Sequence, residues 1–266
     1  MRIEFKETPI SPTILWAARV LTFLPALFLI VDAVMKFAKP KQVVEATTQL
    51  GYPESTILQL GIVLLISTII YLVPRTDVLG AILLTGYLGG AVNTHVRVGA
   101  GWFSILFPVF LGVMLWGGIY LRDTKLASLI PLTTETGRTP QKMLWAGYVM
   151  SIIPVLLLCF SAFMKFTKAP PVIEGFAKFG YQESSLLGIG IVEVLCTILY
   201  LIPRTAVVGA ILLTGYLGGA AATHFRVGDA YFAPIIAGVL VWGGLFLRNE
   251  YVRSLIPVRK QNGFQN

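Results

Sequence analysis

The chain contains only two histidines, and each of them is followed two positions later by an arginine. His95 precedes Arg97, and His224 precedes Arg226. Histidine exchanges protons near physiological pH, and arginine can hold an anionic group. The two His-x-Arg pairs are therefore the first candidates for a site that moves protons or binds an anionic headgroup.

Both pairs lie at the end of a long internal repeat. Residues 74 to 98, PRTDVLGAILLTGYLGGAVNTHVRV, return 129 positions later as PRTAVVGAILLTGYLGGAAATHFRV, with five differences among twenty-five positions. The chain is therefore a tandem duplication. Because the whole block is nearly unchanged, the recurrence of the histidines does not by itself distinguish a site from a scaffold.

The composition is that of an integral membrane protein. Hydrophobic residues make up 56% of the chain and charged residues only 13%, against about 25% charged residues in a soluble domain. The net charge of +8 fits basic residues at the ends of membrane spans, so we expect the lipid bilayer as a partner and no nucleic acid. The first apolar run is too long for a cleaved secretory signal.

Apolar stretches long enough to cross a bilayer predict eight transmembrane helices, four in each half. We expect an all-α integral membrane protein with two parallel-oriented four-helix bundles, related by a pseudo-two-fold axis along the membrane normal. The predicted domains are a first repeat over 1–130, a polar linker over 131–142 and a second repeat over 143–266. The predicted spans are 13–37, 55–73, 76–97, 102–121, 143–166, 184–202, 205–226 and 231–247.

The loops predict the orientation of the chain. The face that holds both termini carries twelve basic residues and the opposite face eight, which favours cytoplasmic termini in a bacterial inner (plasma) membrane. The histidines then lie near the outer ends of the third and seventh spans. Spans two and three are joined only by Pro74-Arg75-Thr76, a tight hairpin in which we expect proline to end one helix and threonine to cap the next.

Small residues recur on one face of the third span in each half. Gly86, Gly90 and Thr94 are spaced by four residues, and the repeat has Gly215, Gly219 and Thr223. Such a face lets a neighbouring helix approach closely. We expect it to pack within its own four-helix bundle rather than to form a dimer interface.

We expect several polar residues to meet with the histidines at the outer rim, where a carboxylate, an imidazole and two cations could bind an anionic or quinone-like headgroup. The alternative is structural, because acids are favoured in the first turn of a helix, cations extend to the lipid headgroups, and histidine can bond a neighbouring helix. The candidates are Lys36, Tyr52, Glu54, His95 and Arg97 in the first half, and Lys165, Tyr181, Glu183, His224 and Arg226 in the second.

The two halves also differ at ionisable positions. Glu193 lies inside the sixth span where the first half has Leu64, which makes it a functional candidate. Its alternative role is a hydrogen bond across the bundle as a protonated acid. Asp32 has Ser161 as its counterpart and lies four residues before Lys36, a spacing that predicts an ion pair within one helix.

Other chemistries are disfavoured by the sequence. Cys159 and Cys196 form no CxxC motif and are expected to be packing residues. The two histidines lack further ligands for a metal, so we expect none. Haem between the histidines would require the third spans of the two halves to face each other. Asn93, which corresponds to Ala222, is a further difference between the halves.

The run Tyr-Leu-Val/Ile-Pro-Arg-Thr, then Gly-Ala-Ile-Leu-Leu-Thr-Gly-Tyr-Leu-Gly-Gly-Ala, then Thr-His-x-Arg-Val-Gly, resembles the signature of the DoxX-like family of four-span membrane proteins. Each half resembles a complete single-copy member. Some relatives in the wider group are subunits of thiosulfate:quinone oxidoreductases or of membrane thiol-redox complexes. The resemblance thus implies a four-span fold for each repeat and leaves the activity open.

Two functions follow as hypotheses. In the first, the protein is a membrane anchor or a quinone-interacting subunit of a redox complex. In the second, it is non-enzymatic, either a transporter of small solutes or lipids or a membrane assembly factor. A quinone site should open sideways at the histidine rim. A transporter should show a polar path from Glu193 to a surface.

Overall fold

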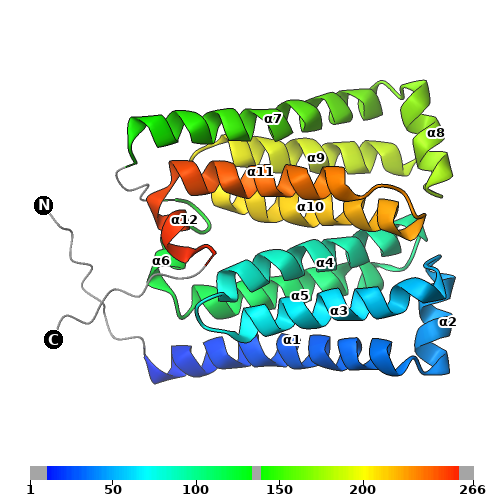
Figure 1. The fold of residues 1–266 in the computed structure, drawn as a ribbon, viewed down its shortest axis with the longest axis horizontal. Helices are drawn as coiled ribbons and strands as arrows, with labels where there is room; N and C mark the ends of the chain where they lie inside the picture. Colours follow the sequence, from blue (N-terminus) through cyan, green and yellow to red (C-terminus); the bar gives the residue numbers. More distant parts are fainter. Residues whose placement is uncertain (1–10, 134–138, 258–266) are drawn as a thin grey trace, which may run out of the picture.

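The computed structural model describes residues 11–133 and 139–257. Within these ranges the chain is helical, and its long helices lie side by side in two groups (Figure 1). The first group is α1 (Pro12–Ala38), α3 (Ile57–Leu72), α4 (Asp77–Arg97) and α5 (Trp102–Tyr120); the second is α7 (Gln141–Phe166), α9 (Ser185–Leu201), α10 (Ala206–Arg226) and α11 (Phe232–Arg248).

Each group is a four-helix bundle. In the first, α1 and α4 each contact both α3 and α5, and in the second α7 and α10 each contact both α9 and α11. The helices α1, α5, α7, α10 and the segment Glu54–Leu72 are long and apolar enough to cross a membrane, whereas α9 and α11 are apolar with 17 residues each. The prediction of an apolar helical membrane protein is confirmed at this level.

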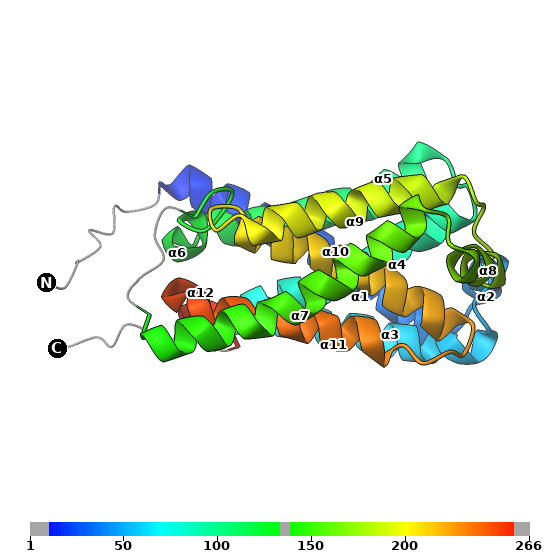
Figure 2. The ribbon, with the colours of Figure 1, turned by 90° about the horizontal axis from the view of Figure 1, so that it is seen from above.

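Short helices outside the predicted spans lie at both ends of the molecule. At one end lie α2 (Lys41–Gln49) and α8 (Pro170–Lys178), and at the other α6 (Thr124–Ala127) and α12 (Glu250–Leu255) (Figures 1 and 2). A 3-10 turn, η1 (Glu54–Thr56), precedes α3. These segments are too short and too polar to resemble spans, which is why the apolar runs alone did not reveal them. The polar linker predicted over 131–142 lies partly outside the described residues, at 134–138.

The predicted hairpins are present, but their threonines act differently from the prediction. Helix α3 ends at Leu72 and α4 begins at Asp77. The Thr76 hydroxyl donates to the carbonyl oxygen of Ile70 at 2.8 Å and so satisfies the end of the incoming helix, whereas we expected it to cap the outgoing one. Thr205 bonds Leu199 in the same way at 2.7 Å.

The glycine faces of α4 and α10 pack against each other, so the prediction that each packs within its own bundle is wrong. A Cβ atom added to Gly89 would overlap the backbone of Gly215, and one added to Gly218 would overlap the backbone of Gly86. Gly215 and Gly218 are the repeat counterparts of Gly86 and Gly89. Such reciprocal contacts are typical of an interface between two equivalent units. We call this α4–α10 contact the junction.

Candidate functional site

Tyr52, in the loop after α2, and Tyr181, in the loop after α8, each contact the last turns of a junction helix, α4 or α10. The Tyr52 hydroxyl lies 3.0 Å from Thr94 Oγ1, and the Tyr181 hydroxyl lies 2.8 Å from Thr223 Oγ1. Each tyrosine follows a glycine with positive φ, 78° at Gly51 and 74° at Gly180, which turns the loop back toward the helix. Burial raises the pKa of Tyr52 and of Tyr181, so both phenols remain protonated donors.

Asn93 connects the two halves at the same place. Its Nδ2 atom is 2.6 Å from the Tyr181 hydroxyl, 2.9 Å from the Gly219 carbonyl oxygen and 2.9 Å from Thr223 Oγ1. Its counterpart, Ala222, can make no such bonds. The polar network at the junction is therefore richer around Tyr181 than around Tyr52.

The two arginines of the His-x-Arg pairs meet near Gly51. A Cβ atom built on Gly51 would lie 3.3 Å from Arg97 Nη2 and 3.3 Å from Arg226 Nη1. Arg97 donates to the Leu50 carbonyl oxygen, and Arg226 donates to that of Phe179 at 2.6 Å. Neither arginine forms an ion pair with a carboxylate of the described chain. Two cations without an acid make this end of the junction electropositive.

The histidines have different surroundings although both occupy the last turns of their helices. The Nδ1 atoms of His95 and His224 are both enclosed without a hydrogen-bond partner. His224 also has Asp229 nearby, with 3.8 Å between Nδ1 and Oδ2, whereas the first half has Ala100 at that position. A hydrogen bond from Lys178 at 2.9 Å lowers the pKa of Asp229, so this carboxylate stays charged beside His224.

The two rim glutamates do not join this cluster. Glu54 is exposed, and Glu183 forms an exposed ion pair with Lys168 at 2.8 Å. Exposed pairs of this kind contribute little to stability.

Glu193 is buried and paired with Lys165. Its Oε2 atom lies 3.0 Å from Lys165 Nζ, and the side chains are 1% and 9% exposed. Lys165 also donates to Ser161 Oγ at 2.5 Å. This contact crosses the bundle between α7 and α9, and its partner is a lysine. In the first half, Lys36 pairs instead with Asp32 on its own helix at 2.5 Å, which confirms the expectation from their spacing.

A cavity of about 790 Å³ lies beside the junction and contains the Lys165–Glu193 pair. It is lined mainly by apolar side chains of α4, α5, α7, α9, α10 and α11. Its polar lining includes Tyr181, His224, Asn93 and Thr223. Two lining residues in the middle of α5 and α7 are strongly exposed, Val113 at 65% and Leu157 at 59%, so the cavity is open at the sides of these helices.

The structure thus divides the predicted site residues other than His95 into three sets. Glu193, Tyr181 and His224 line the cavity; Tyr52, Arg97 and Arg226 lie at the end of the junction; Glu54 and Glu183 face outward. The lining does not include His95.

The partnership of Lys165 with Glu193 and the bonds of Asn93 across the junction were not predicted from the sequence. The signal for both was present, because Glu193 and Asn93 are positions where the repeats differ. These differences do not indicate which helices are neighbours, so the partners could not be identified.

Within the described residues, no group of three or more His, Cys, Asp or Glu side chains is placed to hold a metal ion. The third spans of the two halves do face each other, as a haem between the histidines would require. However, the glycine contacts bring α4 and α10 together backbone to backbone.

Comparison with known proteins returns one family. The sequence model of the DoxX-like family matches the chain twice, over residues 20–118 and 149–244. No curated protein and no solved structure matches the chain. The resemblance carried by the repeated motif is confirmed, and so is the two-part organisation of the match.

Proposed function

Since the chain belongs to the DoxX-like family and carries the family's domain twice, we propose that it is a membrane-embedded binding subunit whose cavity accepts a quinone-like amphiphile. The observation that carries this proposal is the sideways-open, mainly apolar cavity with a buried ion pair inside it. Ligand pockets commonly combine an apolar lining with a few polar groups that fix orientation.

We propose that all eight long helices cross the membrane and that the repeats, 1–130 and 143–266 with the linker between them, are related by a pseudo-two-fold axis through the junction. Helices of 17 residues, such as α9 and α11, are at the short end of the spanning range. The reciprocal glycine contacts support the axis. The basic loops support cytoplasmic termini in a bacterial inner membrane.

The side chains that line the cavity are chemically suited to the groups of a quinone. Apolar side chains such as Val113 and Leu157 suit the ring and its tail, while Lys165 and the Tyr181 hydroxyl can donate hydrogen bonds to its oxygens. A bound quinone would accept electrons from a redox partner subunit. His224 and Glu193 are the groups of this chain that could hold or pass protons at the cavity.

The alternative, a transporter of small solutes or lipids or an assembly factor, has one observation in its favour. The ion pair, Tyr181 and His224 line a single cavity, so polar groups extend from Glu193 toward the α8 end. The apolar lining and the sideways opening favour an amphiphile from the bilayer over a small polar solute.

Fluorescence of Trp116 provides the test, because its indole lines the cavity and donates to Thr85 Oγ1 at 2.9 Å. We expect a short-chain benzoquinone to quench part of the tryptophan fluorescence of the purified protein in a saturable manner. The saturable part should disappear in Trp116→Phe.

Trp242→Phe is the matched control. Trp242 makes the equivalent bond to Thr214 at 2.8 Å but does not line the cavity. This variant should keep the saturable quenching. Quenching that rises only linearly with quinone, or that is equal in the two variants, would refute the proposal.

A further inference from the structure

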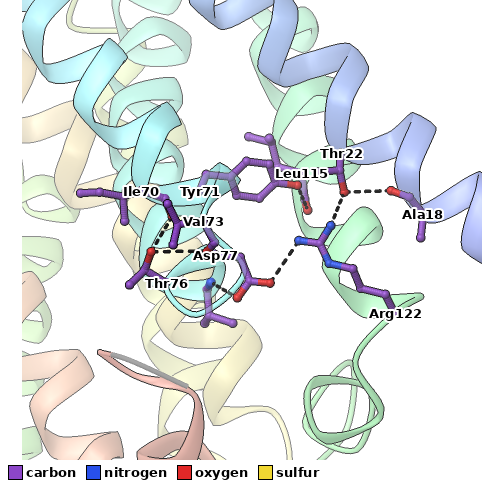
Figure 3. A network of polar contacts seen from close by, with 10 residues as sticks. Ala18, Thr22, Ile70, Tyr71, Val73, Thr76, Asp77, Leu115 and Arg122 are labelled. Carbon is purple, nitrogen blue, oxygen red and sulfur yellow. Dashed lines mark hydrogen bonds and ion pairs between the residues drawn. The ribbon is translucent and has the colours of Figure 1, made fainter. Parts of the chain in front are cut away.

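A buried ion pair closes the α6 end of the first bundle (Figure 3). Asp77, with its side chain only 2% exposed, accepts from Arg122 Nη2 at 3.1 Å. Arg122 Nη1 also donates to Thr22 Oγ1 at 2.8 Å. The other Asp77 carboxylate oxygen accepts from the Val78 backbone N–H at 2.9 Å, at the beginning of α4.

The second bundle has similar residues at the equivalent positions, but not the acid. Thr22, Tyr71 and Arg122 have as counterparts Ser151, Tyr200 and Arg248, but the position of Asp77 is occupied by Ala206. The Tyr200 hydroxyl bonds the Val241 carbonyl oxygen at 2.9 Å, as Tyr71 bonds that of Leu115 at 2.9 Å. The tyrosine contact is therefore repeated, but in the second half the Tyr200 hydroxyl also lies 2.8 Å from Ser151 Oγ, whereas in the first half Arg122 bonds the corresponding Thr22.

Arg248 has no replacement for the Asp77 carboxylate in the described chain. Its Nε and Nη2 atoms are enclosed and have no hydrogen-bond acceptor. The guanidinium carbon lies 4.9 Å from the centre of the Tyr200 ring and 5.7 Å from that of Tyr148. The ring faces attract the positive charge, but they leave these N–H groups unsatisfied.

The space beside Arg248 is a cavity of about 310 Å³. Ala206, at the position that carries a carboxylate in the first half, is one of its lining residues. Thr133, Thr139 and Asn249 add polar groups to the lining. Helix α10 begins at Ala206, and the first turn of a helix favours negative charge.

We propose that this cavity binds an oxyanion, a carboxylate or phosphate group, which supplies the negative charge that Asp77 supplies in the first half. Arginine forms paired hydrogen bonds with either group. The site lies at the α12 end, opposite the His-x-Arg pairs (Figure 1), and it is therefore independent of the proposed quinone cavity. A free anion and a lipid headgroup both offer this chemistry.

Thermal unfolding of the full-length protein in a zwitterionic detergent tests the proposal. We expect formate, acetate or phosphate to raise the Tm in a saturable manner, beyond the effect of chloride at equal ionic strength. Arg248→Gln should remove this effect. Ala206→Asp should remove it as well, and should raise the Tm measured without added anion, because the carboxylate is then part of the chain.

The source of the oxyanion is resolved by a second arm with lipid vesicles. Stabilisation by phosphatidylglycerol but not by phosphatidylcholine, absent in Ala206→Asp, would identify a lipid headgroup. Stabilisation by the free anions would identify a soluble ligand. If wild type and Ala206→Asp respond equally in both arms, or if neither arm stabilises the wild type, the proposal is wrong.

The first half offers a converse variant. Asp77→Ala recreates the arrangement of the second half, so this variant should lose stability and recover it with formate or acetate to a greater extent than the wild type does. This measurement remains decisive if Ala206→Asp fails to fold. An Asp77→Ala protein whose lost stability is not restored by these anions would contradict the proposed replacement.

Discussion

The lysine near the end of α1 and its counterpart near the end of α7 are paired with acids at different positions. Lys36 uses Asp32 on its own helix, whereas Lys165 uses Glu193 on α9 and has Ser161 where the first half has the aspartate. The acid has therefore changed helix between the repeats while the charge balance is kept. Because only Glu193 lines the large cavity, this change also gives that cavity its carboxylate.

Removing the Glu193 carboxylate should strongly destabilise the protein. Glu193→Gln leaves Lys165 charged and 9% exposed without its partner, which costs about 3 to 5 kcal/mol. Unfolding in detergent, followed by circular dichroism, measures the loss. The double variant Glu193→Gln with Lys165→Met removes both charges and should be closer to wild type than the single variant. An unchanged stability in Glu193→Gln would mean that the ion pair does not form.

Transplanting the acid provides a sharper test of the same pair. In the double variant Ser161→Asp with Glu193→Leu, Lys165 would have a partner four residues before it, as Lys36 has in Asp32. We expect this variant to regain much of the stability lost in Glu193→Leu alone. It should nevertheless lose the quinone-dependent part of its fluorescence response if Glu193 helps to bind the headgroup. No recovery of stability would show that the two halves are not interchangeable at this position.

The sequence predicted the interactions that depend only on position along one helix. The Asp32–Lys36 pair follows from a spacing of four residues. The Lys165–Glu193 pair and the bonds of Asn93 to Tyr181 and Thr223 depend on which helices are neighbours and how they are rotated. Helical periodicity does not contain that information. The cavity and the meeting of Arg97 with Arg226 could not be predicted for the same reason.

Among the helices, α4 and α10 determine how the repeats associate. The spacing of Gly86 and Gly90 correctly predicted a surface of close approach, but it could not specify the partner helix. Tight packing on the other bundle requires further glycines, Gly89 and Gly218, which lie outside the predicted four-residue pattern. The spacing of small residues therefore predicts that a helix packs closely, but not which helix it packs against.

Gly89→Ala should destabilise the junction. The added methyl group would overlap the backbone of Gly215, which cannot move aside as a side chain can, so we expect a loss of at least about 2 kcal/mol. Gly188→Ala in α9 is the matched control, because nothing lies within 4 Å of the added atom. The control should change stability by about 1 kcal/mol or less, in the stabilising direction. Equal effects of the two substitutions on the Tm would contradict the close contact.

For the whole molecule, the junction implies that the two repeats should associate without a covalent link. Each half forms a closed ring of four helices, and α4 and α10 join the rings through glycine contacts and the Asn93 bonds. We expect two separately expressed pieces, cut between Thr133 and Thr139, to copurify from detergent-solubilised membranes. Gly89→Leu in the first piece should abolish copurification while each piece remains helical, and Gly188→Leu in the second should not. If the wild-type pieces fail to copurify although both are helical, the linker rather than the junction holds the repeats together.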